Sequence, residues 1–144
     1  MDWNEHYLKL ERMYQAAPIN DFFQPRIHVE KGRCEIVIQA RPELHHAAHA
    51  VHGATYFKAL DDAAFFAVQS LVEGFFVVTA NFNLFLERPV QAGAMRAVGE
   101  VVMAGKNLFV AQAVLTDEQG RELSRGGGNF VRSGIRLTPE ISYA

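Results

Sequence analysis

The sequence predicts an α+β protein in which an antiparallel sheet of about five to six strands wraps around one long central helix. Two observations lead to this fold class. Apolar residues between Tyr56 and Leu71 recur at the spacing of a strongly amphipathic helix. The segments on either side of this helix alternate in polarity and are separated by turn residues, as antiparallel strands are. A single apolar helix among strands is buried only if the sheet curves around it.

The composition is that of a soluble globular protein. Of the 144 residues 49% are apolar and 21% are charged, which predicts a single domain over residues 1–144. The net charge of −2 gives no reason to expect a nucleic-acid or membrane partner. One cysteine, Cys34, cannot form an intrachain disulfide, and residues 2–12 lack the apolar core of a signal peptide. We therefore expect a cytoplasmic protein and a buried, unreactive thiol.

The elements before the central helix are read from apolar spacing. Apolar side chains recur every three or four residues between Trp3 and Tyr14, which predicts a short amphipathic helix over about residues 3–16. Residues 23–40 alternate in polarity on both sides of Gly32 and predict a two-stranded hairpin. The hairpin begins the core of the domain, which we expect to cover about residues 23–133.

The central helix is expected to open at His52 and to end at Gly74. A long strand follows to Leu86, with apolar residues at even positions and Thr79 among the polar residues at odd positions. If the even face packs on the helix, Thr79 points away from it unless a β-bulge intervenes. Three further strands, predicted near residues 94–104, 108–116 and 121–132, complete an antiparallel meander.

Asp61 is the first candidate for chemistry. It lies at the edge of the apolar helix stripe, beside Phe57 and Phe65, where a carboxylate is poorly hydrated and becomes a better base. The alternative is a hydrogen-bonded aspartate at the seam of two elements. The next residue, Asp62, belongs to a polar stripe that predicts a solvent-exposed face, together with Lys58, Gln69 and Glu73.

The start of the helix is the second candidate. Gly53 allows close backbone approach, and the unpaired N–H groups of a first helical turn attract developing negative charge. The alternative is a tight helix entry in which His52 is only a cap. Four histidines fall within eight positions but fit no standard zinc motif, so we expect no metal: His45, His46, His49 and His52.

The stretch from His52 to Ala63 resembles the HGG-x(6)-D-x-A motif of hotdog-fold acyl-CoA thioesterases of the phenylacetate-degradation, or PaaI-like, type. The resemblance continues from Thr79 to Pro89 and covers roughly residues 23–133. It implies a hotdog fold and hydrolysis of acyl-CoA to a free acid and coenzyme A, without a metal or other cofactor.

The resemblance also implies roles for individual residues. Asp61 matches the catalytic carboxylate, acting as general base or nucleophile, and the N–H of Gly53 polarises the thioester oxygen. Thr79 matches the residue that helps to orient water, although a β-propensity residue on a polar sheet face is the open alternative. His52 supports the loop. Among substrate-binding residues we count Phe57, Phe65 and Ala54.

Two positions depart from the family pattern. His46 stands where many relatives carry asparagine, so either it replaces that donor or the contact is lost. Ala54 replaces the second glycine and crowds the helix entry. Any of five basic residues could hold the coenzyme A phosphates, and nothing in the sequence ranks them: Arg88, Arg96, Lys106, Arg125 and Arg132.

The spacing of the two catalytic candidates predicts an oligomer. Gly53 and Asp61 are eight residues apart on one helix, which separates their backbones by about 12 Å along the axis. A reacting carbon cannot contact both groups. We therefore expect a homodimer, possibly a dimer of dimers, whose twofold axis brings Gly53 of one chain to Asp61 of the other. A hotdog dehydratase and a non-catalytic acyl-CoA sensor remain the alternative functions.

Overall fold

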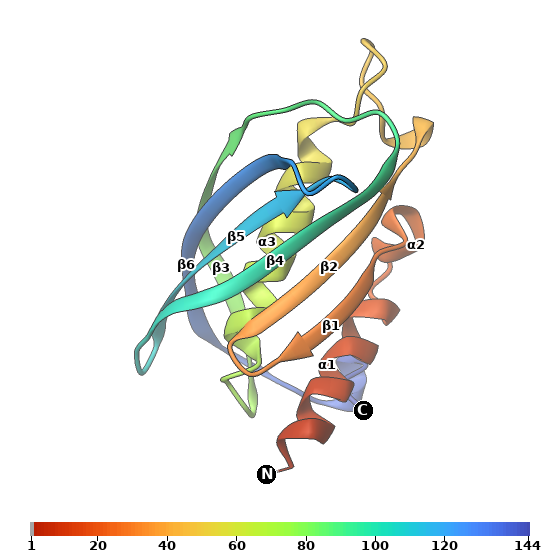
Figure 1. The fold of residues 1–144 in the computed structure, drawn as a ribbon. Helices are drawn as coiled ribbons and strands as arrows, with labels where there is room; N and C mark the ends of the chain where they lie inside the picture. Colours follow the sequence, from red (N-terminus) through yellow and green to blue (C-terminus); the bar gives the residue numbers. More distant parts are fainter. Residues whose placement is uncertain (1) are drawn as a thin grey trace.

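A computed structural model describes residues 2–144 and confirms the predicted α+β class. One six-stranded antiparallel sheet, in the order β1-β2-β4-β5-β6-β3, curves around helix α3 (Figure 1). The elements are α1 (Trp3–Ala16), α2 (Asn20–Phe23), β1 (Arg26–Glu30), β2 (Arg33–Ala40), η1 (Pro42–Leu44), α3 (Gly53–Gln69), β3 (Phe75–Leu86), β4 (Gly93–Ala104), β5 (Leu108–Thr116), β6 (Glu122–Arg136) and η2 (Pro139–Ile141).

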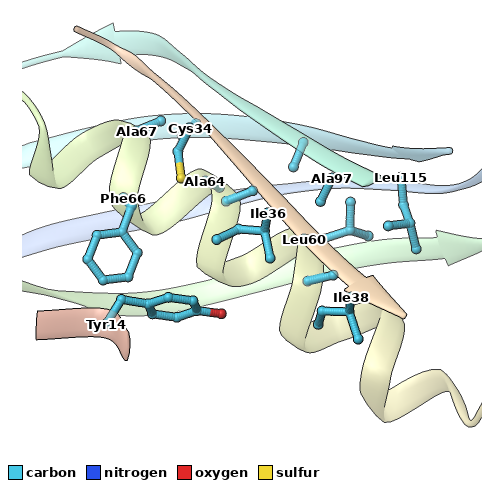
Figure 2. Close-up of a cluster of buried hydrophobic side chains, with 14 of the residues drawn as sticks. Tyr14, Cys34, Ile36, Ile38, Leu60, Ala64, Phe66, Ala67, Ala97 and Leu115 are labelled. Atoms are coloured by element: carbon cyan, nitrogen blue, oxygen red, sulfur yellow. The ribbon is translucent and has the colours of Figure 1, made fainter. Parts of the chain in front are cut away.

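Small side chains let the sheet pack closely on α3. A Cβ atom added to Gly99 of β4 would lie 2.3 Å from the carbonyl group of Ala63, so the two backbones touch without side chains between them. Next to this contact, the larger residues Ile36 and Ile38 of the neighbouring strand β2 point from the sheet onto α3 (Figure 2). Cys34 belongs to the same core and is fully buried, as predicted.

Three boundaries differ from the sequence prediction, and one of them is the end of β6, which lies at Arg136 rather than near residue 132. The hairpin begins at Arg26 rather than at residue 23, because Asn20–Phe23 forms the short helix α2. Helix α3 ends at Gln69 rather than at Gly74, and the hydroxyl of Ser70 donates to the carbonyl of Ala67 in the last turn. Gly74, with a φ of 82°, lies in the turn that leads into β3.

A β-bulge divides strand β3 into two halves. Thr79 pairs with Phe130 of β6 while Asn81 pairs with the adjacent Asn129, so Ala80 is an extra residue on β3. Before the bulge, Val77 is fully buried and Thr79 contacts Asp61 of α3, so these two odd positions face the helix. The expectation that the odd face of the strand points away from the helix is therefore wrong at Val77 and Thr79. The extra residue turns Thr79 toward α3.

The polar stripe of α3 is covered rather than solvent-exposed. Tyr14 of α1 donates a hydrogen bond of 2.6 Å to Asp62, and Lys58 lies 2.6 Å from the same carboxylate. Gln69 is fully buried and donates to the carbonyls of Val72 and of the first residue of β3. The prediction of a solvent-exposed face is therefore wrong for Lys58, Asp62 and Gln69, and α1 and α2 cover the first two. Of the four residues in the predicted stripe, Glu73 alone is exposed.

The C-terminal segment returns to α1, and both chain ends lie on the same side of the molecule (Figure 1). The buried ring of His6 is 2.6 Å from the hydroxyl of Tyr143 and 3.0 Å from the carbonyl of Gln69. Arg12 donates a bond of 2.6 Å to the carbonyl of Ala144. Within residues 2–144, none of the helices combines the length and the apolar character needed to span a bilayer.

Candidate active site

The carboxylate of Asp61 lies between α3 and the first half of β3. The hydroxyl of Thr79 donates a hydrogen bond of 2.9 Å to Oδ1 of Asp61. Aromatic rings flank the pair one turn away in each direction along α3. Phe57 packs on Phe82 with ring centroids 5.6 Å apart, and the ring of Phe65 lies 5.2 Å from that of Phe76. The result is a half-buried acid with apolar neighbours.

This environment changes the acidity of Asp61. Burial removes water from the carboxylate and raises the pKa of Asp61 from its ordinary value of 3.8 to about 6. The hydrogen bond from Thr79 acts in the opposite direction because it stabilises the charged form. The charge of Asp62 raises the pKa slightly, and Lys58 lowers it. Asp61 is therefore ionised at neutral pH, yet it is a stronger base than an exposed aspartate.

The N-terminus of α3 presents a free backbone donor. Nδ1 of His52 accepts a bond of 2.9 Å from the N–H of Ala54 and caps the helix. Within residues 2–144 the N–H of Gly53 has no acceptor. A Cβ atom on Gly53 would lie 2.9 Å from a methyl group of Leu86, so the bare glycine keeps this donor accessible beside the end of β3. Ala54, the other residue of this turn, is exposed.

The structure brings Asp61 and Thr79 together but leaves Gly53 apart from them. Both Gly53 and Asp61 belong to α3, which runs unbroken from residue 53 to residue 69. The eight-residue interval again corresponds to about 12 Å along the helix axis. Within one chain, the free donor and the carboxylate cannot act on one carbonyl group.

The histidines before α3 do not converge on a common point. Nδ1 of His46 accepts from the N–H of Ala48, and its exposed ring lies 6.5 Å from the ring of His52. The ring of His45 instead contacts the carbonyl of Gln91. Over the described range, 2–144, no three His, Cys, Asp or Glu side chains are grouped as metal ligands. His46 is thus placed near the helix entry with its second ring nitrogen, Nε2, available.

The structure separates the basic residues by their partners. Arg96 pairs with Glu35 at 3.3 Å, and Arg125 pairs with Glu122 at 2.6 Å. Arg88, Lys106 and Arg132 are exposed and form no ion pair with any residue in the described part of the chain. The backbone carbonyl of Arg88 accepts a bond of 2.7 Å from Tyr56, in the first turn of α3. Arg88 is therefore an uncommitted cation near the free N–H of Gly53.

Sequence reasoning missed the Tyr14–Lys58–Asp62 cluster behind Asp61. The ammonium group of Lys58 lies 5.1 Å from the ring centre of Tyr14 and 5.2 Å from that of Phe23. Tyr14 belongs to α1 and Phe23 to α2, whereas Lys58 and Asp62 belong to α3. The four-residue spacing of Lys58 and Asp62 was the only local signal, and it gave no indication that aromatic side chains would cover the pair.

Comparisons with known proteins found a matching family model and similar solved structures. A family model described as the thioesterase superfamily matches residues 48–124, which include Gly53, Asp61 and Thr79. The E. coli PaaI protein, from the phenylacetic acid degradation operon, has a similar structure with a TM-score of 0.85. It is 20% identical, and the match covers 94% of this chain and 98% of that protein. No curated protein matches the sequence.

Other thioesterase structures have the same architecture. A mutant thioesterase from Pseudomonas aeruginosa matches with a TM-score of 0.79 and 16% identity, over 90% of this chain and 94% of that one. A Haemophilus influenzae thioesterase matches with a TM-score of 0.77 and 17% identity, over 85% and 87%. The fold of this chain is accordingly the hotdog fold, as the motif implied.

Proposed function

Because this chain belongs to the thioesterase superfamily, we propose that it hydrolyses acyl-CoA thioesters to a free carboxylic acid and coenzyme A. The observation that carries the proposal is the state of Asp61. A half-buried carboxylate with a raised pKa, oriented through Oδ1 by Thr79, has the properties of a general base at neutral pH.

The proposed reaction uses water as the attacking group. Oδ1 of Asp61 accepts from Thr79, so Oδ2 is left to take a proton from water. The resulting hydroxide adds to the thioester carbon, and the negative charge moves to the carbonyl oxygen. Collapse of this intermediate breaks the carbon–sulfur bond and releases coenzyme A as the thiol after proton return from Asp61. Direct attack by Asp61, through an anhydride that water then cleaves, is the variant of this path.

The developing oxyanion needs a donor that the same chain cannot supply. We assign this role to the N–H of Gly53 from a second copy, so the active unit is at least a homodimer and possibly a dimer of dimers. Strand β3 supports this assignment because it is an edge strand and carries Thr79. The edge of β3 is available to pair with a strand of that second copy.

The remaining residues have supporting roles in the proposal. His52 caps the donor helix, and Ala54, Phe57 and Phe65 contact the substrate. His46 takes the place of the asparagine found in many relatives, and its free Nε2 would donate to the carbonyl or to the water. Arg88 is the basic residue we expect to contact the coenzyme A phosphates, because it is exposed, forms no ion pair within the described residues and lies near Gly53. No metal or other cofactor takes part.

The substitution Asp61→Asn tests the base. It should abolish thiol release from acyl-CoA while circular dichroism and the oligomeric state remain those of the wild type. Gly53→Pro tests the donor, since proline removes the N–H and is tolerated at the first position of a helix. Its ring also meets a methyl group of Leu86, so Gly53→Ala, which makes the same contact but keeps the N–H, is the matched control and should retain activity. The preceding residue, His52, has the extended backbone that proline requires, with a φ of −64° and a ψ of 141°.

A mixture of the two variants tests whether the site is shared between chains. In a mixed dimer, one site combines an intact Asp61 with an intact Gly53 from the other chain. Random reassembly of two inactive variants should therefore restore about a quarter of the wild-type activity. Mixtures that stay inactive, from variants shown to exchange subunits, would contradict a site built from two chains.

Binding of acyl-CoA without turnover is the second candidate, and the histidine at position 46 is the observation that favours it. Calorimetric binding of acyl-CoA with no thiol release would support this candidate. In that case His46→Asn should produce measurable hydrolysis. A dehydratase reading has no specific support in the described site.

A further inference from the structure

An apolar hollow of about 510 Å³ lies beside the candidate site, between the end of α1, the start of β3 and the C-terminal segment. Its apolar walls include Met13 and Ala16 from α1, Phe76 from β3, Ile135 from β6 and Ile141 from η2. This volume is within the range of pockets that hold small organic ligands. Among the described residues that line it, Glu140 is the one that carries a charge.

An irregularity in the sheet contributes to this hollow. Phe75 pairs with Arg136 and Val77 pairs with Arg132, so three residues of β6 stand opposite Phe76 alone. The hydroxyl of Ser133 donates to the carbonyl of Phe76 and satisfies that backbone group within the irregular stretch. Ile135 belongs to the same stretch and is 50% exposed. An isoleucine and a phenylalanine beside one open hollow leave apolar area that a ligand can cover.

Two aromatic rings in contact, those of Phe65 and Phe76, lie between Asp61 and the wall of the hollow. Phe65 follows Asp61 by one turn of α3, which is about 6 Å along the helix axis. Its ring packs on Phe76, and Phe76 lines the hollow. Along β3, Thr79 contacts Asp61 and Phe76 comes three residues earlier. The rings of Phe65 and Phe76 therefore supply apolar surface in the direction of the hollow, which an acyl chain with its thioester at Asp61 can follow.

We propose that this hollow holds the distal part of a long, unbranched acyl chain whose thioester lies at Asp61. The inference rests on the proposed function and names its substrate class. The apolar walls favour methylene groups, and Glu140 disfavours an acyl chain that ends in a second carboxylate. A butyryl group ends near Asp61, whereas a dodecanoyl group extends past Phe65 into the hollow.

The segments that build this hollow lie outside the matched thioesterase segment, 48–124, except for β3. The C-terminal wall is held against α1 by the contacts of Tyr143 with His6 and of Ala144 with Arg12. The two chain ends thus supply the selectivity for the acyl chain, while α3 and β3 supply the chemistry.

The test compares binding of two non-hydrolysable thioethers, S-butyl-CoA and S-dodecyl-CoA, by calorimetry. Each methylene buried in the hollow should tighten binding about fourfold. Burial of only two methylenes would already make the wild-type protein bind S-dodecyl-CoA about 15-fold more tightly than S-butyl-CoA, and we expect at least this preference. The variant Ile135→Trp fills the hollow with a larger side chain and should remove most of this preference. A dodecyl ligand that ends in a carboxylate should bind more weakly than S-dodecyl-CoA, and Glu140→Gln should reduce that difference.

Val102→Trp is the matched control, because Val102 is 60% exposed on β4 and lies outside the hollow. It should leave both affinities unchanged. Equal affinity of the wild type for both thioethers, or a preference that survives in Ile135→Trp, would overturn the subsite. Hydrolysis is read separately with butyryl-CoA and dodecanoyl-CoA. A length preference in binding without any thiol release would overturn the proposed function and leave the subsite standing.

Discussion

The raised pKa of Asp61 makes the stability of the folded protein depend on pH, and Asp61→Asn isolates this dependence. The folded protein holds the Asp61 proton up to about pH 6, whereas the unfolded chain releases it near pH 3.8. Between these values the folded state binds more protons, so the free energy of unfolding falls as the pH rises. Above pH 6 the folded protein carries the full cost of a desolvated charge. Asparagine removes that charge and still accepts from Thr79.

The magnitude follows from the two pKa values. A shift from 3.8 to about 6 corresponds to about 3 kcal/mol, which is an upper limit because the side chain retains some contact with water. At pH 8 the variant should gain up to this amount in unfolding free energy. For a domain of this size, each kcal/mol raises the melting temperature by about 4 °C. We therefore expect a gain of up to about 12 °C at pH 8 and almost none at pH 4.

Thermal unfolding followed by circular dichroism, at fixed protein concentration between pH 4 and pH 8, measures this effect. Asp62→Asn is the control, because Asp62 is paired with Lys58 and Tyr14. Its removal leaves a partly buried ammonium group unpaired and should lower the melting temperature at pH 8. If Asp61→Asn is no more stable than the wild type at pH 8, or gains equally at pH 4, the carboxylate is not desolvated and its assignment as the base loses its physical reason.

Three further substitutions give expected outcomes that are simple to measure. Thr79→Val removes a hydrogen bond that lowers the pKa of Asp61. The acid limb of the kcat/KM profile should therefore move up by about one pH unit. An unchanged profile would show that the bond does not influence the base. Gly99→Ala places a Cβ against the backbone of Ala63 and should cost about 3 kcal/mol in chemical denaturation, whereas Gly134→Ala, with open space around it, should cost little. His52→Ala removes the cap of α3 and should cost about 1 kcal/mol by the same measurement.

The sequence was most informative where a single periodicity governs a long segment. Helix α3 begins at Gly53 as expected because the apolar stripe and the capping residue His52 indicate the same start. The strands after it lie close to their predicted boundaries, since turn residues separate them. Asp61 was located on the correct edge of α3 because its neighbours on the stripe, Phe57 and Phe65, are local in sequence.

The sequence was least informative where distant segments decide the environment. Lys58 and Asp62 read as exposed because nothing within one helix shows that Tyr14, more than forty residues earlier, will cover them. Lys58 and Asp62 form an ion pair that other elements cover. Within the helix sequence, such a covered ion pair has the same four-residue spacing as an ion pair exposed to water. Only the packing of α1 distinguishes the two.

The bulge in β3 shows why a perfect alternation can mislead. Val78 and Ala80 are as apolar as the buried Val77, so composition does not indicate where the strand changes face. The backbone pairing with β6 decides it, through the extra residue at Ala80. Without that residue, Thr79 would face away from α3 whenever Phe82 faced toward it. Because of the bulge, one strand packs Phe82 against the core and also directs the hydroxyl of Thr79 to Asp61. The proposed orientation of the catalytic carboxylate therefore depends on this extra residue.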